Sequence, residues 1–215
     1  MERKQIIASG RNILTLEAEA LFETSLKLDS SGFAEAIELI YKCTGHVILL
    51  GVGKSGHIGN KIAATLSSTG TPSFFMHPVE ARHGDMGAIT QNDVVLLISY
   101  SGETEELISL IPCLKNRDVK TISITGNPGS SLAEKTNVHI ALSVRREACP
   151  HNLAPTASSN ATLALGDALA IVVMQMRGFT QSDFLRNHPA GALGRTLIAT
   201  DPGNTITPTP PIPRT

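Results

Sequence analysis

The chain has 215 residues, of which 41% are hydrophobic and 17% charged, a composition typical of one globular domain. Its formal net charge is -1 at pH 7 and only 4% of its residues are aromatic, which argues against nucleic-acid and anionic-membrane partners. The first residues, MERKQIIASG, lack the apolar core of a signal peptide, and no apolar run has the length of a membrane span, so we expect a cytoplasmic protein.

The N-terminal region predicts two helices. Apolar residues recur every three to four positions from Ile6 to Leu28, the spacing of a long amphipathic helix, and the same spacing predicts a second helix over residues 33–41. Both precede the first strand. We therefore expect them to cover one face of a sheet or to pack against a partner subunit.

The middle of the chain alternates apolar runs with helical patterns. The expected strands are HVILLG at 46–51, PSFFM at 72–76, the apolar part of NDVVLLISYSG at 92–102, VKTISITG at 119–126 and NVHIAL at 137–142. Helical patterns cover residues 55–69 and 103–116, and a short helix is expected near Leu132. This alternation predicts a three-layer α/β fold, in which helices cover both faces of a five-stranded parallel sheet.

The C-terminal part contains a long apolar run and a change of composition. Residues 157–177 are almost uncharged but include Asp167, which favours a buried or interfacial helix over a membrane span. The last residues, DPGNTITPTPPIPRT, contain five prolines and few hydrophobic residues. We expect one domain over 1–199 and a disordered proline-rich tail over 200–215.

The first glycine-rich loop, GVGKSG, follows a predicted strand and precedes a predicted helix. Its glycines are Gly51, Gly53 and Gly56, at G-x-G-x-x-G spacing, which lets backbone N–H groups approach an anion. A P-loop is excluded because its first glycine would stand at Ile48. A dinucleotide site would need a carboxylate near the end of the second strand, where only Glu80 follows, several residues late. Lys54 inside the turn indicates a small charged ligand.

A second loop, SYSGET, also follows an apolar strand and opens a predicted helix. Ser99, Ser101 and Thr104 can donate hydroxyl hydrogen bonds beside the free N–H groups of the helix start. One such hydroxyl alone would indicate only a helix cap. The two loops together favour a phosphate-binding site.

Five motifs in this sequence resemble the sugar isomerase (SIS) domain family and, within it, the arabinose 5-phosphate isomerases. They are GVGKSGHIGNKIAATLSSTGTPSFF, HPVEARHGDMGAI, ISYSGETEEL, REACPHNLAPTASS and NHPAGALGR, and the likeness as a whole spans residues 16–197. The resemblance implies a flavodoxin-like sheet, a homotetramer, and interconversion of D-ribulose 5-phosphate with D-arabinose 5-phosphate, which feeds 3-deoxy-D-manno-octulosonate and lipopolysaccharide. Longer family members carry two CBS modules after this domain. Here a proline-rich tail stands in their place, so we expect no regulation by such a module.

The resemblance also assigns the candidate site residues. It carries over Lys54, Glu106, Glu147 and His188 as active-site positions, with His83 as a further catalytic candidate. The expected substrate-binding residues are Gly53, Ser55, Ser99, Ser101, Gly102, Thr104 and Ser158. The family's histidine in NHPAGALG reaches a neighbouring subunit's site, so the resemblance predicts active sites shared between subunits.

Aldose–ketose conversion through an enediol needs a base, a group that polarises the carbonyl and a group that opens the cyclic aldose. We expect Glu147 to be the base, with apolar walls that raise its pKa toward neutrality. Glu106 is the alternative, but a position at a helix start should lower its pKa. His188 suits ring opening because the ordinary histidine pKa lies near neutrality.

No cofactor and no metal are expected. His77, His83 and Asp85 lack a ligand spacing on one helical face, and the three cysteines are far apart, as reduced thiols of a cytosolic protein would be. Two other functions remain open. A phosphosugar-binding sensor without chemistry would share the fold but usually adds a DNA-binding segment, and a dinucleotide oxidoreductase would leave SYSGET unexplained.

Overall fold

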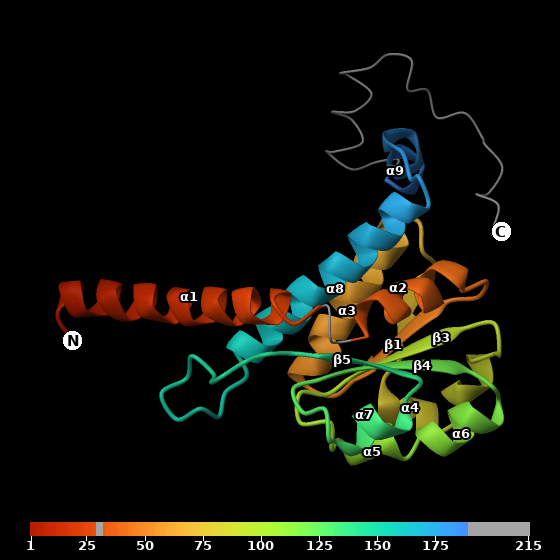
Figure 1. Cartoon of the computed structure of the whole chain (residues 1–215), viewed down its shortest axis with the longest axis horizontal. Helices are drawn as coiled ribbons and strands as arrows, with labels where there is room; N and C mark the ends of the chain where they lie inside the picture. The colour runs from red at the N-terminus through yellow and green to blue at the C-terminus, as the bar shows by residue number, and fades with distance from the viewer. Residues whose placement is uncertain (29–31, 189–215) are drawn as a thin grey trace.

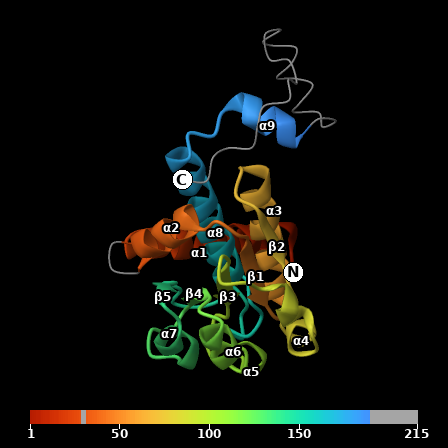
Figure 2. The same ribbon diagram turned by 90° about the vertical axis from the view of Figure 1, so that its right-hand side faces the viewer.

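The computed structural model describes residues 1–28 and 32–188, and it confirms the predicted three-layer α/β fold. A five-stranded parallel sheet lies between two layers of helices, as the two perpendicular views show (Figures 1 and 2). The expected tail over 200–215 and most of the NHPAGALGR motif lie outside the described residues.

The sheet has the strand order β2-β1-β3-β4-β5, with every neighbouring pair parallel. The strands are β1 (Val47–Gly51), β2 (Ser73–Phe75), β3 (Val94–Ile98), β4 (Lys120–Thr125) and β5 (Val138–Ala141). β1 and β3 are buried on both faces, which explains their unbroken apolar sequences. The chain passes to opposite faces after β1 and after β3, and in such sheets ligands bind at this reversal, at the carboxyl ends of the strands.

Three helices cover one face of the sheet: α2 (Phe33–Lys42), α3 (Lys54–Ser68) and α8 (Ala157–Met176). α3 and α8 approach closely because Gly166 on α8 faces Ile62 on α3, where any Cβ would overlap the isoleucine. By length and composition α8 could span a membrane, but half of its apolar window is buried inside the protein. It is a core helix of this domain, as the sequence predicted.

Shorter helices cover the other face: α4 (Pro78–Arg82), the 3-10 helix η2 (Asp85–Ala88), α5 (Glu105–Ile108), α6 (Ile111–Asn116) and α7 (Ser131–Lys135). The single helix predicted over 103–116 is wrong, because the chain breaks into α5 and α6. Pro112 cannot donate an N–H to the carbonyl of Ile108, so a continuous helix would lose that bond. α4 and η2 were not predicted.

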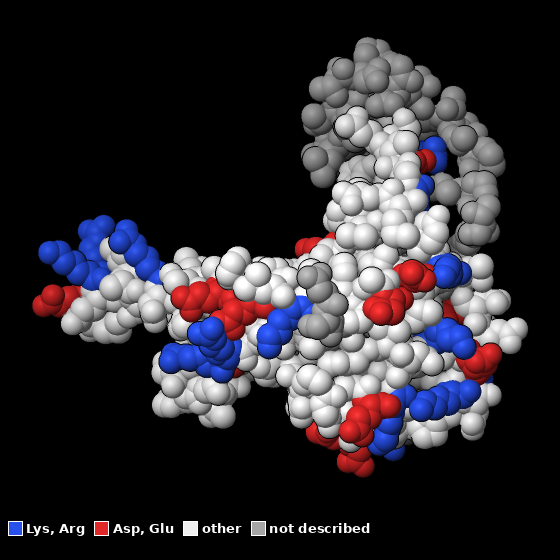
Figure 3. All heavy atoms as spheres, viewed as in Figure 1, with Lys and Arg blue, Asp and Glu red and all other residues white. Residues whose placement is uncertain are grey.

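Two helices lie at the ends of the described chain. α1 (Arg3–Ser25) packs on α8 through its C-terminal part, where Ala20 and Thr24 are buried, whereas residues 1–15 are exposed and stand away from the body (Figure 1). Basic side chains gather at its far end, and the rest of the face in Figure 3 carries mixed charges. α9 (Gln181–Asn187), also not predicted, follows the C-terminal end of α8.

Candidate active site

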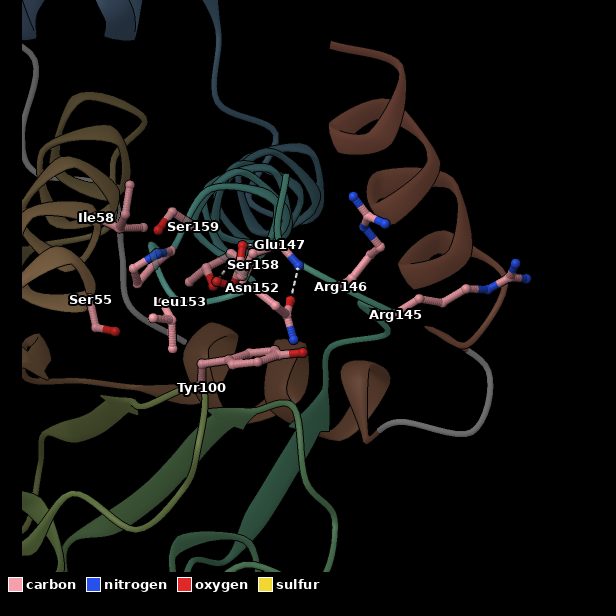
Figure 4. A pocket seen from close by; sticks show the side chains of 12 residues that line it. Ser55, Ile58, Tyr100, Arg145, Arg146, Glu147, Asn152, Leu153, Ser158 and Ser159 are labelled. Carbon is pink, nitrogen blue, oxygen red and sulfur yellow. Dashed lines mark hydrogen bonds between the residues drawn. The ribbon is translucent and has the colours of Figure 1, made fainter. Parts of the chain in front are cut away.

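A pocket of about 200 Å³ opens at the carboxyl edge of the sheet, between the N-terminal ends of α3 and α8 (Figure 4). Its described lining consists of Ser55, Ile58, Tyr100, Arg145, Arg146, Glu147, Asn152, Leu153, Pro155, Ser158, Ser159 and Thr162. These residues come from α3, from the loop after β3, from the segment that joins β5 to α8, and from the first turns of α8. The pocket therefore lies at the topological reversal between β1 and β3, where doubly wound sheets bind ligands.

Glu147 is the buried carboxylate of this pocket, with 7% of its surface exposed. Its Oε2 atom accepts hydrogen bonds from the backbone N–H of Thr156 (2.8 Å), the hydroxyl of Thr156 (3.1 Å) and the backbone N–H of Ser158 (3.2 Å). Thr156 is the residue before α8 and Ser158 is its second residue. Glu147 thus satisfies N–H groups that the start of a helix leaves without intrahelical partners.

These bonds decide how readily Glu147 ionises. Burial alone would raise its pKa, but the hydrogen bonds from Ser158 and Thr156 outweigh burial and lower the pKa below its ordinary value of 4.5. The expectation that apolar walls raise the pKa of Glu147 toward neutrality is therefore wrong. The carboxylate is ionised at neutral pH and held by the start of α8.

The segment around Glu147 is braced by its own polar groups. The backbone N–H of Glu147 donates to Oδ1 of Asn152 at 2.7 Å (Figure 4), and the N–H of Ala148 donates to the Thr156 hydroxyl at 2.9 Å. Asn152 adopts a positive φ of 55°, which asparagine tolerates better than most residues. These two hydrogen bonds within the loop hold the Glu147 carboxylate in one position relative to α8.

The predicted phosphate loop after β3 gathers its hydroxyls into one cluster. Oγ of Ser99 lies 2.7 Å from Oγ1 of Thr104 and 3.4 Å from Oγ of Ser101, and it accepts the N–H of Gly102 at 3.1 Å. Gly102 has a positive φ of 71°, and a Cβ there would overlap Ser130. The neighbouring Glu103 is turned away, because its Oε1 accepts the N–H of Ser131 at 2.8 Å.

The first glycine loop makes the turn from β1 into α3. A Cβ at Gly51 would come within 2.8 Å of the backbone of Ser55, and one at Gly56 within 2.8 Å of the Gly51 carbonyl oxygen. Gly53 precedes α3 with a positive φ of 59° and has open space around it. Lys54 begins the helix with its side chain exposed, and Ser55 faces the pocket.

The structure brings some of the predicted residues together and separates others. Ser55, Glu147 and Ser158 line the pocket, while Gly53, Lys54, Ser99, Ser101, Gly102 and Thr104 lie in the two loops at its edge. Glu106 is half-buried in the first turn of α5, outside the described lining. His83 ends α4 and is exposed.

His188 lies far from this pocket. It follows α9, beyond the C-terminal end of α8, whereas Glu147 caps the N-terminal end of α8 (Figure 1). The 20 residues of α8 span about 30 Å. The His188 ring stacks on Phe184 with centroids 4.0 Å apart, and Nδ1 lies 2.9 Å from the Phe184 carbonyl oxygen.

Sequence reasoning missed several lining residues. Tyr100, Arg146 and Asn152 stand inside the motifs SYSGET and REACPHNLAPTASS, and Arg145 directly precedes the second motif. Their positions in those motifs were the available signal. Within residues 1–28 and 32–188, no group of three His, Cys, Asp or Glu side chains is arranged to hold a metal ion.

Comparison with known proteins identifies related chains. The SIS domain model matches residues 39–172. The chain is 52% identical over 190 residues to the arabinose 5-phosphate isomerase KdsD of Shigella flexneri, covering 88% of this chain and 58% of that protein. It therefore spans less than two thirds of the length of the curated relatives it matches.

Solved structures agree with this result. A protein of Escherichia coli CFT073, solved in complex with arabinose 5-phosphate, is 41% identical, with a TM-score of 0.83 over 88% of this chain and 100% of that one. A putative sugar-phosphate isomerase from Listeria monocytogenes is 30% identical, with a TM-score of 0.83 and the same coverage of both chains.

Proposed function

Because the chain belongs to the SIS domain family, we propose that it is an aldose–ketose isomerase that interconverts D-ribulose 5-phosphate and D-arabinose 5-phosphate through an enediol. One observation carries the proposal furthest. A buried, ionised carboxylate, Glu147, faces a pocket beside a cluster of three hydroxyls, in a chain 52% identical to a protein named for this reaction. Isomerisation of a sugar phosphate needs both features. The hydroxyls donate hydrogen bonds to the charged phosphate, and the carboxylate moves a proton between two carbons of the sugar.

In this proposal the loop after β3 binds the phosphate. The hydroxyl of Ser99 lies within hydrogen-bond distance of the hydroxyls of Ser101 and Thr104, and each of the three can rotate to donate to a phosphate oxygen. α5, which follows, has only four residues, so the hydroxyls and the local N–H groups contribute more than a helix dipole does.

Glu147 is the proposed base that moves the proton between C1 and C2. Its ionised form accepts the proton from C1 of the ketose and returns it at C2 of the enediol, while a proton leaves O1 and one is gained at O2, so that the carbonyl moves from C2 to C1. Lys54, exposed at the start of α3 beside the lining residue Ser55, is the proposed group that stabilises the developing oxyanion. The aldopentose closes a ring through O4, whereas the ketopentose phosphate has its O5 esterified and cannot form a furanose, so ring opening is needed in one direction only.

We propose that His188 opens this ring in a neighbouring subunit of a homotetramer. Its place beyond the far end of α8 keeps it from the pocket of its own chain, which supports a role in another subunit's site. Exposed apolar side chains on α1, among them Ile13, Leu14 and Phe22, offer a surface for such an association. His83 stays a further candidate, exposed after α4.

We also propose that the reaction takes place in the cytoplasm and supplies the precursor of 3-deoxy-D-manno-octulosonate for lipopolysaccharide. The three cysteines, Cys43, Cys113 and Cys149, all lie within the described residues and form no disulfide with one another, which fits a reducing compartment.

The test is incubation of the purified chain with D-ribulose 5-phosphate in deuterated buffer, followed by NMR. The expected result is D-arabinose 5-phosphate with deuterium at the carbon that received the proton. The second candidate function is a binding module without chemistry, which the use of Glu147 as a helix cap also fits. Binding of the sugar phosphate, measured by calorimetry, without any turnover or exchange would favour that module over the isomerase.

A further inference from the structure

We propose that Tyr100 is a positioning residue, which holds the segment carrying Glu147 at a fixed place relative to the phosphate-binding loop. The inference rests on the proposed isomerase function, since it concerns how the two halves of that site are kept in register. Tyr100 belongs to the loop after β3, and Glu147 follows β5. β3 and β5 are not neighbours in the sheet, because β4 lies between them.

Tyr100 bridges this gap directly. Its hydroxyl donates to the carbonyl oxygen of Val144 at 3.0 Å, three residues before Glu147. The hydrogen bond therefore crosses the end of β4 and joins the two loops that flank it. Among the described residues of the phosphate loop, Tyr100 is the one that also lines the pocket, with 37% of its surface exposed (Figure 4).

The Tyr100 ring packs against Gly126, the residue after β4. The backbone N–H of Gly126 donates to the Tyr100 carbonyl oxygen at 2.8 Å, and a Cβ at position 126 would overlap the Tyr100 ring. The ring thus lies directly on the Gly126 backbone, which leaves it little freedom to swing. A rigid ring with its hydroxyl bonded at the far end acts as a strut between the two loops.

The pKa of the Tyr100 hydroxyl distinguishes a positioning role from a role in proton transfer. Burial, and then the negative charge of Glu147, raise the pKa of Tyr100 above its ordinary value of 10.0, so the hydroxyl stays protonated and remains a donor at neutral pH. That proton is already engaged by the Val144 carbonyl. Tyr100 is therefore assigned to positioning, through Glu147, rather than to proton transfer.

The experiment compares the full chain with Tyr100→Phe, which keeps the ring and removes the hydrogen bond. The control is Tyr41→Phe, since Tyr41 is the other tyrosine of the chain and lies on α2 beside Arg177, outside the pocket. Two measurements are made on each protein. Hydrogen–deuterium exchange follows the peptides over residues 144–158, and steady-state kinetics give kcat, KM and the inhibition constant of inorganic phosphate.

For Tyr100→Phe we expect faster exchange of the amides of Ala148, Thr156 and Ser158, which donate to Thr156 and Glu147, while the β3 amides keep their protection. We expect kcat to fall by about tenfold or more, because small displacements of a reacting group are costly. KM and the phosphate inhibition constant should change by less than about twofold, since the phosphate hydroxyls are untouched. Tyr41→Phe should match the parent chain.

If amide hydrogen–deuterium exchange over residues 144–158 is the same in Tyr100→Phe as in the parent chain, Tyr100 does not position this segment, whatever the effect on activity. A loss of phosphate affinity in proportion to kcat would show instead that Tyr100 contacts the substrate. If the parent chain does not isomerise ribulose 5-phosphate, the proposed function fails, and the exchange measurement still tests the strut by itself.

Discussion

Glu147 performs a structural task that is visible in the free protein and a chemical one that is proposed. Three donors from Thr156 and Ser158 hold its Oε2 atom at the start of α8. A substitution of Glu147 therefore has to remove the base while it keeps the hydrogen-bond acceptor at the start of α8. Glutamine suits this purpose, because its amide oxygen still accepts hydrogen bonds.

We predict that Glu147→Gln lowers turnover by about a hundredfold or more, the usual effect of losing a general base, while KM changes little. The variant should also lose deuterium exchange at the migrating carbon. Glu106→Gln, outside the described pocket lining, serves as the comparison. If Glu106→Gln abolishes exchange and Glu147→Gln does not, the two carboxylates have been assigned the wrong way round.

The lowered pKa of Glu147 predicts a pH-dependent contribution to stability. A group whose folded pKa lies below its unfolded value stabilises the fold above the unfolded pKa, and this contribution is lost as the pH falls through the folded pKa. The unfolding free energy of the parent chain should thus exceed that of Glu147→Gln by a constant amount at neutral pH, and the difference should shrink below pH 4.5. Urea unfolding over a pH series measures it, and a difference that stays constant well below pH 4.5 contradicts the capping role.

The hydroxyl cluster predicts the behaviour of the phosphate loop. Ser101→Ala and Thr104→Ala each remove one donor to a charged oxygen, worth roughly 1.5 to 3 kcal/mol, so each should weaken substrate binding by about tenfold or more. Steady-state KM and the inhibition constant of inorganic phosphate report this loss. Unchanged values in both variants would remove the loop from the phosphate site.

At the scale of elements, the contact between α3 and α8 depends on a missing side chain. Gly166→Ala would push a methyl group into Ile62, and such overpacking destabilises a core by about 1–3 kcal/mol. Gly10→Ala is the matched control, since Gly10 lies inside α1 with nothing within 4 Å of its Cβ position. The control should stabilise its helix by about 0.5–1 kcal/mol, so chemical denaturation should give shifts of opposite sign.

The sequence predicted β1 and β3 well because their apolar runs are buried on both faces, and it also found the edge strands β2 and β5, which are only partly buried. It predicted α3 to within one residue at each end, since GVGKSG marks its start. It failed for the break between α5 and α6, because the helical pattern outweighed Pro112. It also failed for α4 and α9, of five and seven residues, which are too short to show a helical period.

The site was predictable to the level of its loops but not of their contacts. SYSGET and RREACPHNLAPT indicated polar turns after strands, yet the pairing of Glu147 with Thr156 and Ser158 depends on where α8 begins in space. The bond from Tyr100 to Val144 joins residues 44 positions apart across β4. Neither contact has a local sequence signal, and the first of them lowers the pKa of the proposed base.

At the scale of the whole molecule, Glu147 and His188 lie beyond opposite ends of α8. We predict that inactive His188→Ala and inactive Glu147→Gln chains regain part of the activity when their subunits exchange, because some mixed sites then hold both native residues. Native mass spectrometry verifies the exchange and a coupled assay follows the activity. Verified exchange without recovered activity would place His188 outside the partner's site.

The capping of α8 by Glu147 also constrains how chains of this fold can diverge. A descendant that gives up catalysis and keeps only ligand binding cannot simply discard the acid, since the first N–H groups of its central helix would lose their acceptor. It must keep an acceptor there, either as a glutamine in place of Glu147 or as aspartate, asparagine or serine at or near the position of Thr156. Loss of the acid with such an acceptor in place would leave a folded binding protein, whereas loss of the acid without one would destabilise the start of α8.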